Sequence, residues 1–293
     1  MKKLYELYPY NFGQVYGQSL EKAKICVIPV PYEATLSYQA GAGRGPAAII
    51  EASRHLDEMW DSLKEGELSG FKTSDVYTFD EVILSKNSVI EALKCLEQFI
   101  SEEVVKKEKF PLVLGGEHSL TFPAVKALKR KYKDLSVLHF DAHTDLLNSF
   151  EDSKYNHACV MRRIHELNIK TVSIGIRNIN YAVTDYLKKR RSKNVYYMPE
   201  IPGLEKILKA LSKNVYLTFD LDAFDPSIMP SVGTPEPGGL FWWPTIELLN
   251  KIIPKVNLVG ADVMELKPIP GLEAPNFLAA KLVYHIIRAK LTS

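Results

Sequence analysis

The sequence predicts an α/β fold in which about eight parallel strands form one doubly wound sheet with helices on both faces. Short apolar segments alternate with longer amphipathic segments along the 293 residues, which is the order of elements in a parallel sheet. The apolar segments are continuous runs, and strands of that kind are buried on both faces. No stretch rich in Gly, Ser or Pro divides the chain, so we expect a single domain over residues 1–293.

The expected strands are short runs of β-branched, aliphatic and aromatic residues that end at turns or polar loops. The first is the run KICVIPV, which stops where Pro31 and Tyr32 follow. The expected strands cover residues 24–30, 110–114, 135–140, 170–175, 194–198, 214–219 and 256–263.

The expected helices are recognised by apolar residues that recur every three or four positions. The clearest pattern covers residues 89–104. Another helix is expected to begin at Pro46, because a proline in the first turn removes no intrahelical hydrogen bond. That helix would present Ile49, Leu56 and Trp60 on one face. The remaining helices are expected at residues 121–131, 155–167, 181–190, 204–211, 244–253 and 274–289.

The composition is that of a globular protein and excludes several functional classes. Hydrophobic residues make up 46% of the chain, and 37 Lys and Arg nearly balance 35 Asp and Glu, so neither disorder nor a nucleic-acid partner is expected. No apolar run reaches the roughly 18–20 residues of a membrane helix, and the N-terminus lacks the apolar core of a signal peptide. Cys26, Cys95 and Cys159 are scattered, which favours a reducing compartment. We therefore expect a cytoplasmic protein with no membrane partner.

Three of the expected strands end in clusters of acidic residues and histidines. The clusters are GGEHS at residues 115–119, DAHTD at residues 141–145 and DLDAFDP at residues 220–226. Because the carboxyl ends of parallel strands meet at one edge of the sheet, where binding sites form, the clusters should lie close together. Alternate residues of an extended backbone point to the same side, so DxHxD and DxD each direct their polar side chains one way.

The acidic side chains of these clusters would repel one another unless they bound protons or cations. They are Asp141, Asp145, Asp220 and Asp222. Two divalent cations would balance their charge. His118 and His143 would add nitrogen ligands, and these six side chains could hold two ions if one or two Asp bridged them. Carboxylates and imidazoles without a thiolate favour Mn²⁺ or a similar hard ion over structural Zn²⁺. Two ions about 3.5–4 Å apart would generate hydroxide from a shared water at neutral pH, which predicts hydrolysis.

The three clusters, in this order, resemble the metal-binding signatures of the ureohydrolases, the family of arginase, agmatinase and formiminoglutamase. The resemblance extends over nearly the whole chain and is closest to agmatinase. It also includes SYQAGAGRGP at residues 37–46, NHACVMRR from residue 156, GTPEPGGL at residues 233–240 and DVMELKP at residues 262–268. It implies an arginase-like fold.

The resemblance also implies a role for each residue of the site. One Mn²⁺ would be bound by His118 and Asp145 and the other by His143 and Asp222, while Asp141 and Asp220 would bridge both ions. A hydroxide between the ions would attack the guanidinium carbon, giving urea and an amine. The remaining residues would bind substrate or move protons: Glu265 would hold the guanidinium, His157 would shuttle protons, Asp145 would assist proton transfer, and Thr234 would support Glu265.

Several departures from the family pattern bear on the substrate. The Asn-rich loop with which arginases hold the α-amino and α-carboxylate groups of arginine is not visible between Asn148 and His157. We therefore expect agmatine, a decarboxylated guanidine, as substrate, with putrescine and urea as products. Glu117 stands where arginases carry Asp and is expected to support the ligands without binding metal. Trp242 and Trp243 are expected to pack in the core or at a subunit contact.

Alternatives stay open at the level of the substrate. Arginase, guanidinobutyrase, formiminoglutamase and aminopropylagmatine ureohydrolase activities share the metal chemistry and differ at the substrate tail. Relatives form trimers and hexamers, so the resemblance implies a homo-oligomer. A nucleotide-binding fold is disfavoured because no glycine-rich phosphate loop links a strand to a helix. A metal-binding scaffold without activity is disfavoured because all six ligands and Glu265 are present.

Overall fold

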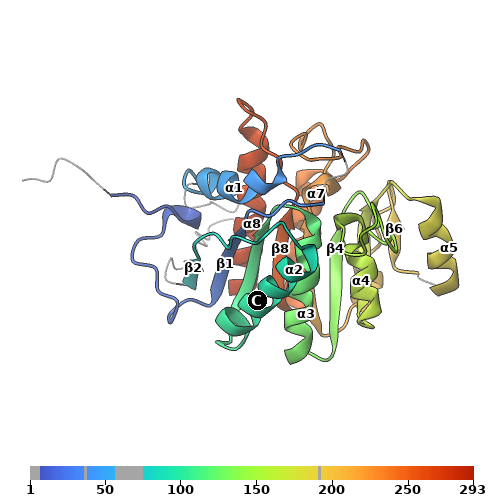
Figure 1. Ribbon diagram of the computed structural model, residues 1–293, viewed down its shortest axis with the longest axis horizontal. Coiled ribbons are helices and arrows are strands. Elements are labelled where there is room, and N and C mark those ends of the chain that lie inside the picture. The colour runs from blue at the N-terminus through green and yellow to red at the C-terminus, as the bar shows by residue number, and fades with distance from the viewer. Residues whose placement is uncertain (1–6, 36–37, 57–74, 191–192) are drawn as a thin grey trace, which may run out of the picture.

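A computed structural model describes residues 7–35, 38–56, 75–190 and 193–293. In this part of the chain eight parallel strands form one sheet in the order β2-β1-β3-β8-β7-β4-β5-β6 (Figure 1). The strands are β1 Ile25–Val30, β2 Val76–Thr78, β3 Phe110–Gly115, β4 Leu135–Phe140, β5 Lys170–Ile176, β6 Val195–Tyr197, β7 Asn214–Asp220 and β8 Asn257–Met264. The fold class expected from the sequence is confirmed.

Helices cover both faces of the sheet, as the continuous apolar strands predict. The helices are α1 Gly45–Ser53, α2 Val89–Phe99, α3 Thr121–Lys131, α4 Val160–Glu166, α5 Tyr181–Arg190, α6 Leu204–Ala210, α7 Trp242–Ile252 and α8 Ala274–Thr292. α1, α6, α7 and α8 share one apolar core, and α2, α3, α4 and α5 share the other. In Figure 1, α2, α3 and α4 lie in front of the sheet and α8 lies behind it. None of the described helices is long and apolar enough to cross a bilayer.

Alternate residues of β1 show why each strand is apolar throughout. Ile25 and Val27 belong to the core under α1 and α8, whereas Cys26 and Ile28 belong to the core under α2 and α3. A polar residue at any of these positions would be buried beneath a helix, which is costly without a hydrogen-bond partner.

The strand that the sequence patterns do not locate is β2. It has three residues and pairs in parallel with β1 at the edge of the sheet. Three residues are too few for a periodicity to be recognised, which explains why no range was expected there.

Several helices differ from the expected bounds. The helix expected at 89–104 is α-helical only as far as Phe99 and continues as a π-helical segment at Ile100–Val105. α1 ends at Ser53, whose hydroxyl bonds the carbonyl of Ile50 and so competes with the helix; Leu56 lies past its end and Trp60 lies outside the described residues. The helix expected at 155–167 starts with a 3₁₀ turn at His157–Cys159 and becomes α4 at Val160. α7 begins before Pro244, which a first turn tolerates.

The strands that end in the polar clusters are neighbours in the sheet. β3, β8, β7 and β4 are consecutive in the strand order, and their registers align Leu114 with Val263, Phe219 with Val263, and Phe140 with Phe219. The residues that follow these strands therefore converge at one edge of the sheet, where ligands bind in parallel α/β folds.

Candidate metal centre and cavity

A cavity of about 290 Å³ opens at the carboxyl edge of the sheet. All nine residues that the sequence singled out for this site line it: His118, Asp141, His143, Asp145, His157, Asp220, Asp222, Thr234 and Glu265. Segments after β1, β3, β4, β5, β7 and β8 thus contribute to one site.

The turn after β3 is held against the segment after β1 by a close backbone contact. A Cβ on Gly116 would lie 2.0 Å from the carbonyl oxygen of Tyr32, so only glycine fits there. The carbonyl of Gly116 also accepts the backbone N–H of Glu265 at 2.9 Å. These contacts fix the backbone from which His118 projects.

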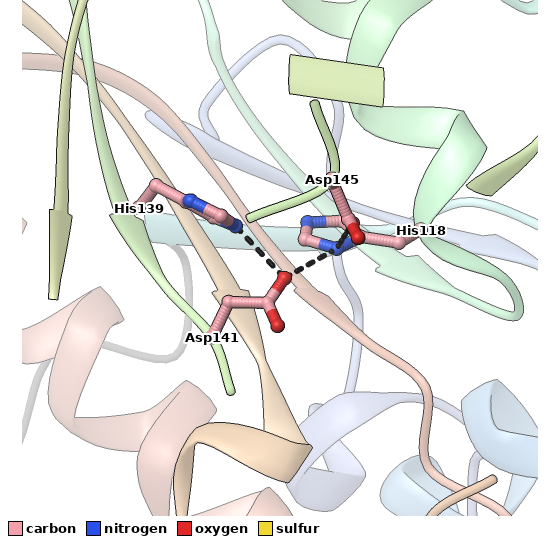
Figure 2. Close-up of side chains that lie close together, drawn as sticks. All are labelled: His118, His139, Asp141 and Asp145. Carbon is pink, nitrogen blue, oxygen red and sulfur yellow. Dashed lines mark hydrogen bonds and ion pairs between the residues drawn. The ribbon is translucent and has the colours of Figure 1, made fainter. Parts of the chain in front are cut away.

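His118 faces three carboxylates with one ring nitrogen and a hydroxyl with the other. Its Nδ1 lies 3.0 Å from Asp145 Oδ2 and 3.2 Å from Oδ2 of both Asp141 and Asp220. Its Nε2 lies 2.8 Å from Oγ1 of Thr218. Figure 2 shows the ring placed between Asp145 and Asp141. Thr218 therefore holds the ring so that Nδ1 points into the carboxylates.

A second group of ligand atoms surrounds His143. Its Nδ1 lies 2.9 Å from Asp222 Oδ2 and 3.5 Å from Asp141 Oδ1. The other oxygen of Asp222 accepts the backbone N–H of Ala142 at 2.9 Å. The ligand atoms of Asp141, His143 and Asp222 lie within 4.8 Å of one another, as do those of His118, His139, Asp141 and Asp145. Asp141 therefore belongs to both groups.

The donor set fits hard divalent cations. His118 Nδ1 is buried without a hydrogen-bond partner in the described chain, although three carboxylates face it. Burial raises the pKa of Asp220, and the charges of Asp222 and Asp141 raise this pKa further. Burial and the charge of Asp141 likewise raise the pKa of Asp222. Oxygen and imidazole ligands without thiolate suit Mn²⁺ or a similar ion.

Two residues of the site have left-handed backbone conformations. Asp145 has a φ of 50° and Glu265 a φ of 66°, which are uncommon for residues other than glycine. Glu265 Oε1 accepts the backbone N–H of His118 at 2.7 Å. Burial raises the pKa of Glu265 to about 8, with the negative charge of Glu117 adding to the rise. Strained residues of this kind concentrate at functional sites.

His157 lies on the cavity wall beside Thr35. The threonine hydroxyl accepts the backbone N–H of His157 at 3.1 Å and contacts its Nδ1 at 3.1 Å. The same hydroxyl donates to Glu117 Oε1 at 2.9 Å. Glu117 Oε2 accepts the backbone N–H groups of Ala34 and Thr35. Glu117 thus connects the turn after β3 to the segment after β1, a supporting position that agrees with the expectation.

Two further residues lie next to the candidate ligands. His139 donates or accepts through Nε2 at 2.8 Å from Asp141 Oδ2, and its Nδ1 lies 3.0 Å from Ser173 Oγ (Figure 2). Thr234 Oγ1 lies 3.4 Å from Asp222 Oδ2. Its hydroxyl therefore contacts a candidate metal ligand, and its support of Glu265 stays a prediction.

Arg177, which the sequence patterns did not identify, joins the two loops that carry Asp222 and Thr234. It follows β5, and its hydrogen bonds to described residues all go to main-chain carbonyl oxygens. The acceptors are the carbonyl oxygens of Gly175, Asp222, Ala223, Phe224, Glu236 and Pro237. A charged residue at the carboxyl end of an apolar strand was the signal that could have identified it.

Cys159, Trp242 and Trp243 lie outside the cavity lining. Cys159 is buried, and burial raises the pKa of its thiol to about 11, so the thiol is unreactive. Trp242 packs in the core with its ring 5.5 Å from that of His285. Trp243 is 51% exposed.

Comparisons with known proteins agree with this geometry. The family model described as the Arginase family matches residues 23–288. The N(1)-aminopropylagmatine ureohydrolase of Synechocystis sp. is 35% identical, covering 92% of this chain and 90% of its own. The agmatinase of Pyrococcus horikoshii is 32% identical, covering 92% of both chains. Among solved structures, the agmatine ureohydrolase of Thermoplasma volcanium superposes with a TM-score of 0.81 at 30% identity, covering 99% of this chain and 96% of its own.

Proposed function

The chain belongs to the arginase family, and we propose that it hydrolyses agmatine to putrescine and urea. It is a ureohydrolase of the agmatinase type, a hydrolase of C–N bonds in linear guanidines. Residues of the cavity support both the identity of the metal and the identity of the substrate tail.

We propose that two Mn²⁺ ions bind in the cavity. His118 and Asp145 would bind one ion, and His143 and Asp222 the other. Asp141 and Asp220 would contact both. Asp141 belongs to both groups of ligand atoms, and Asp220 Oδ2 lies 3.2 Å from His118 Nδ1 in the first group. When bound, two such ions lower the pKa of a water and supply hydroxide at neutral pH.

The chain's own residues would then bind the guanidinium and move the protons. Glu265 would pair with the guanidinium group, which a carboxylate can hold through two parallel hydrogen bonds; its position is fixed by the N–H of His118. Asp145 would assist proton transfer to the leaving amine. His157, half-buried on the wall beside Thr35, would exchange protons with solvent. Thr234 would hold Asp222.

The charge of the cavity lining favours a substrate tail without a carboxylate. The described residues that line the cavity include acidic, amide, hydroxyl and apolar side chains but no Lys or Arg. A carboxylate on the substrate would therefore meet negative charge without a cationic partner, which is unfavourable in a partly buried site. This disfavours arginine, guanidinobutyrate and formiminoglutamate, whereas agmatine carries only positive charge. Phe150 lines the cavity within the 148–157 segment, where arginases hold the α-substituents of arginine.

N(1)-aminopropylagmatine is the second candidate substrate. It satisfies the same charge argument, and the relative of that name in Synechocystis is 35% identical over 278 residues. The two compounds differ only in the aminopropyl extension of the tail, so the metal and guanidinium chemistry proposed above applies to both.

A urea-release screen tests the assignment. The Mn²⁺-loaded protein is assayed with agmatine, N(1)-aminopropylagmatine, arginine and 4-guanidinobutyrate. Agmatine is expected to give the highest kcat/KM, and a higher value for aminopropylagmatine would replace it with the second candidate. Urea release from arginine or guanidinobutyrate alone would contradict the charge argument. The Glu265→Gln variant, which keeps the shape of the side chain, is expected to be inactive.

We also propose a homo-oligomer, a trimer or hexamer, in the cytoplasm. Phe241 and Trp243 are each 51% exposed at the start of α7, and adjacent exposed aromatic residues are typical of subunit contacts. All three cysteines are free, which favours a reducing compartment. Analytical ultracentrifugation of the Trp243→Ser variant against the parent chain tests the contact: it should shift the distribution toward smaller species.

A further inference from the structure

Glu33 is a cavity carboxylate for which the proposed chemistry gives no role. The other acidic residues on the lining are the four candidate metal ligands, the guanidinium partner Glu265, and Glu117, which is bonded to backbone N–H groups. Glu33 follows β1 and lies two residues before Thr35. It therefore belongs to the wall on which His157 also lies.

Only one oxygen of Glu33 has hydrogen-bond partners in the described chain. Oε1 accepts the backbone N–H groups of Gly41 at 2.7 Å and of Ala42 at 2.8 Å. These bonds fix the carboxylate at the start of the 3₁₀ turn Ala42–Arg44. Oε2 has neither a hydrogen bond nor an ion pair to a described residue, so its charge is held in place without a protein cation to pair with.

Two cations lie near Glu33 without forming an ion pair to it. Lys267 and Arg44 both approach Gly41, but the ammonium of Lys267 contacts Gln39 Oε1. Neither cation lies within ion-pair distance of Glu33 among the described residues. A cation that entered the cavity would therefore be the natural partner for this carboxylate.

Another part of the lining is apolar. Leu146, Leu147, Phe150 and Val183 line the same cavity, and methylene groups pack favourably against such side chains. The cavity thus combines a guanidinium-binding carboxylate, Glu265, with apolar surface and a second fixed carboxylate, Glu33. A linear molecule with a guanidinium at one end and an ammonium further along an aliphatic chain matches this combination.

We propose that Glu33 binds the distal ammonium group of the substrate tail and thereby selects cationic guanidines. This inference rests on the proposed function, since it assigns Glu33 to a guanidine that already occupies the Glu265 site. It makes Glu33 a specificity-determining residue, whose effect depends on the charge of the tail and is separate from the hydrolytic step.

The Glu33→Gln variant removes the charge of Glu33 and keeps its hydrogen bonds to the backbone. The amide oxygen of Gln can still accept the N–H groups of Gly41 and Ala42, whereas the negative charge is lost. With Mn²⁺ present, kcat/KM for agmatine is expected to fall about 10-fold or more, mainly through KM, because a charge-assisted hydrogen bond is lost. For 1-butylguanidine, which has the same chain length without the amine, kcat/KM should change less than about 2-fold because that bond never forms.

A charge reversal and a remote control complete the test. Glu33→Lys should favour 4-guanidinobutyrate relative to agmatine. The matched control is Glu81→Gln, an exposed carboxylate outside the lining, which should leave the ratio of the two kcat/KM values unchanged. Equal losses for agmatine and butylguanidine in Glu33→Gln, or no loss for agmatine, would overturn the inference. If the parent chain released urea from neither agmatine nor butylguanidine, the proposed function would be overturned, and the inference with it.

Discussion

Buried polar side chains in the candidate centre are oriented by other polar groups that come from distant parts of the sequence. Thr218 Oγ1 contacts His118 Nε2 at 2.8 Å and Thr121 Oγ1 at 3.2 Å. Thr121 in turn donates to Asp262 Oδ2 at 2.8 Å, and the same oxygen accepts the hydroxyl of Tyr216. This chain of contacts holds the imidazole ring from behind. Such groups fix the orientation and tautomer of a metal-binding histidine.

Thr218→Val should therefore weaken metal binding without removing a ligand. Valine has nearly the same shape but leaves His118 Nε2 without its partner, so the ring can rotate. We expect a loss of about 10- to 100-fold in Mn²⁺ affinity for one of two sites, measured by equilibrium dialysis. Thr218→Ser keeps the hydroxyl and should bind Mn²⁺ with nearly the parent affinity. Equal affinity in the valine and parent proteins would show that Thr218 does not position His118.

At the scale of the elements, the loops after β5 and β7 and the 233–240 loop are joined by hydrogen bonds to main-chain atoms. Arg177, in the loop after β5, donates to carbonyl oxygens of the other two segments, including that of Asp222 at 2.7 Å. Asp225 adds a second connection, because its Oδ2 accepts the N–H groups of Gly238 and Gly239. The geometry of Asp222 therefore depends on elements that are far apart in the sequence.

Arg177→Met tests this dependence. The variant removes the donors but keeps much of the aliphatic volume, which leaves several carbonyl oxygens unpaired. We expect the free energy of unfolding to fall by about 2–4 kcal/mol and Mn²⁺ affinity to fall with it. Arg190→Met, at the exposed end of α5, should cost no more than about 0.5 kcal/mol. Chemical denaturation of the two variants side by side gives the comparison.

His165 links α4 to β5 and α5 and should make stability depend on pH. Its Nε2 lies 2.7 Å from Thr171 Oγ1 and its Nδ1 lies 2.9 Å from the hydroxyl of Tyr186. Burial, together with the charges of Arg190 and Arg162, lowers the pKa of His165 to about 3. In the unfolded chain a histidine has a pKa of about 6.5. Between these values the unfolded chain binds the extra proton, so acidification favours unfolding.

The contribution of His165 to this dependence can be isolated by substitution. Its titration should lower the free energy of unfolding by about 2 kcal/mol between pH 7 and pH 5. His165→Gln removes the titrating group and keeps a donor and an acceptor, so its stability should fall less over the same interval. Denaturation curves for both proteins at the two pH values measure the difference. Parallel pH dependence would contradict the assignment.

The sequence was sufficient to predict most elements and the convergence of the site, for identifiable reasons. The clusters around His118, Asp141 and Asp220 are contiguous and follow long apolar strands, so sheet topology alone brings them together. The resemblance to the arginase family that these motifs indicate is confirmed. Arg177, Thr218 and Glu33 escaped prediction because their partners are set by loop conformation and strand register, which no local pattern encodes.

At the scale of the whole molecule, the balance of charge conceals a concentrated negative site. The chain has 37 Lys and Arg against 35 Asp and Glu, yet the sheet brings four aspartates to one buried edge. Burial and its neighbours hold the pKa of Asp220 well above its usual range. Without a metal ion, the raised pKa of Asp220 opposes folding at neutral pH, because this carboxyl ionises more readily in the unfolded chain. Metal binding should therefore contribute directly to the stability of the fold.

Saturating Mn²⁺ should raise the melting temperature by about 5 °C or more relative to protein treated with a chelator. A ligand at 100 times its Kd stabilises the folded state by about 2.7 kcal/mol per site, and a chain of this size gains about 2 °C per kcal/mol. Asp220→Asn, which removes a repelling charge, should match or exceed the metal-free parent in stability and lose most of the Mn²⁺ shift.

The Asp141→Ala variant tests whether Asp141 is a ligand of both ions. Because Asp141 belongs to both groups of ligand atoms, its removal should abolish tight binding of both ions and the whole Mn²⁺-dependent shift. His143→Ala touches only the second group and should retain one ion and part of the shift. Metal content by plasma mass spectrometry, together with thermal melts, separates these cases. Two Mn²⁺ ions per chain in purified Asp141→Ala would refute the bridging role and leave the two groups as independent sites.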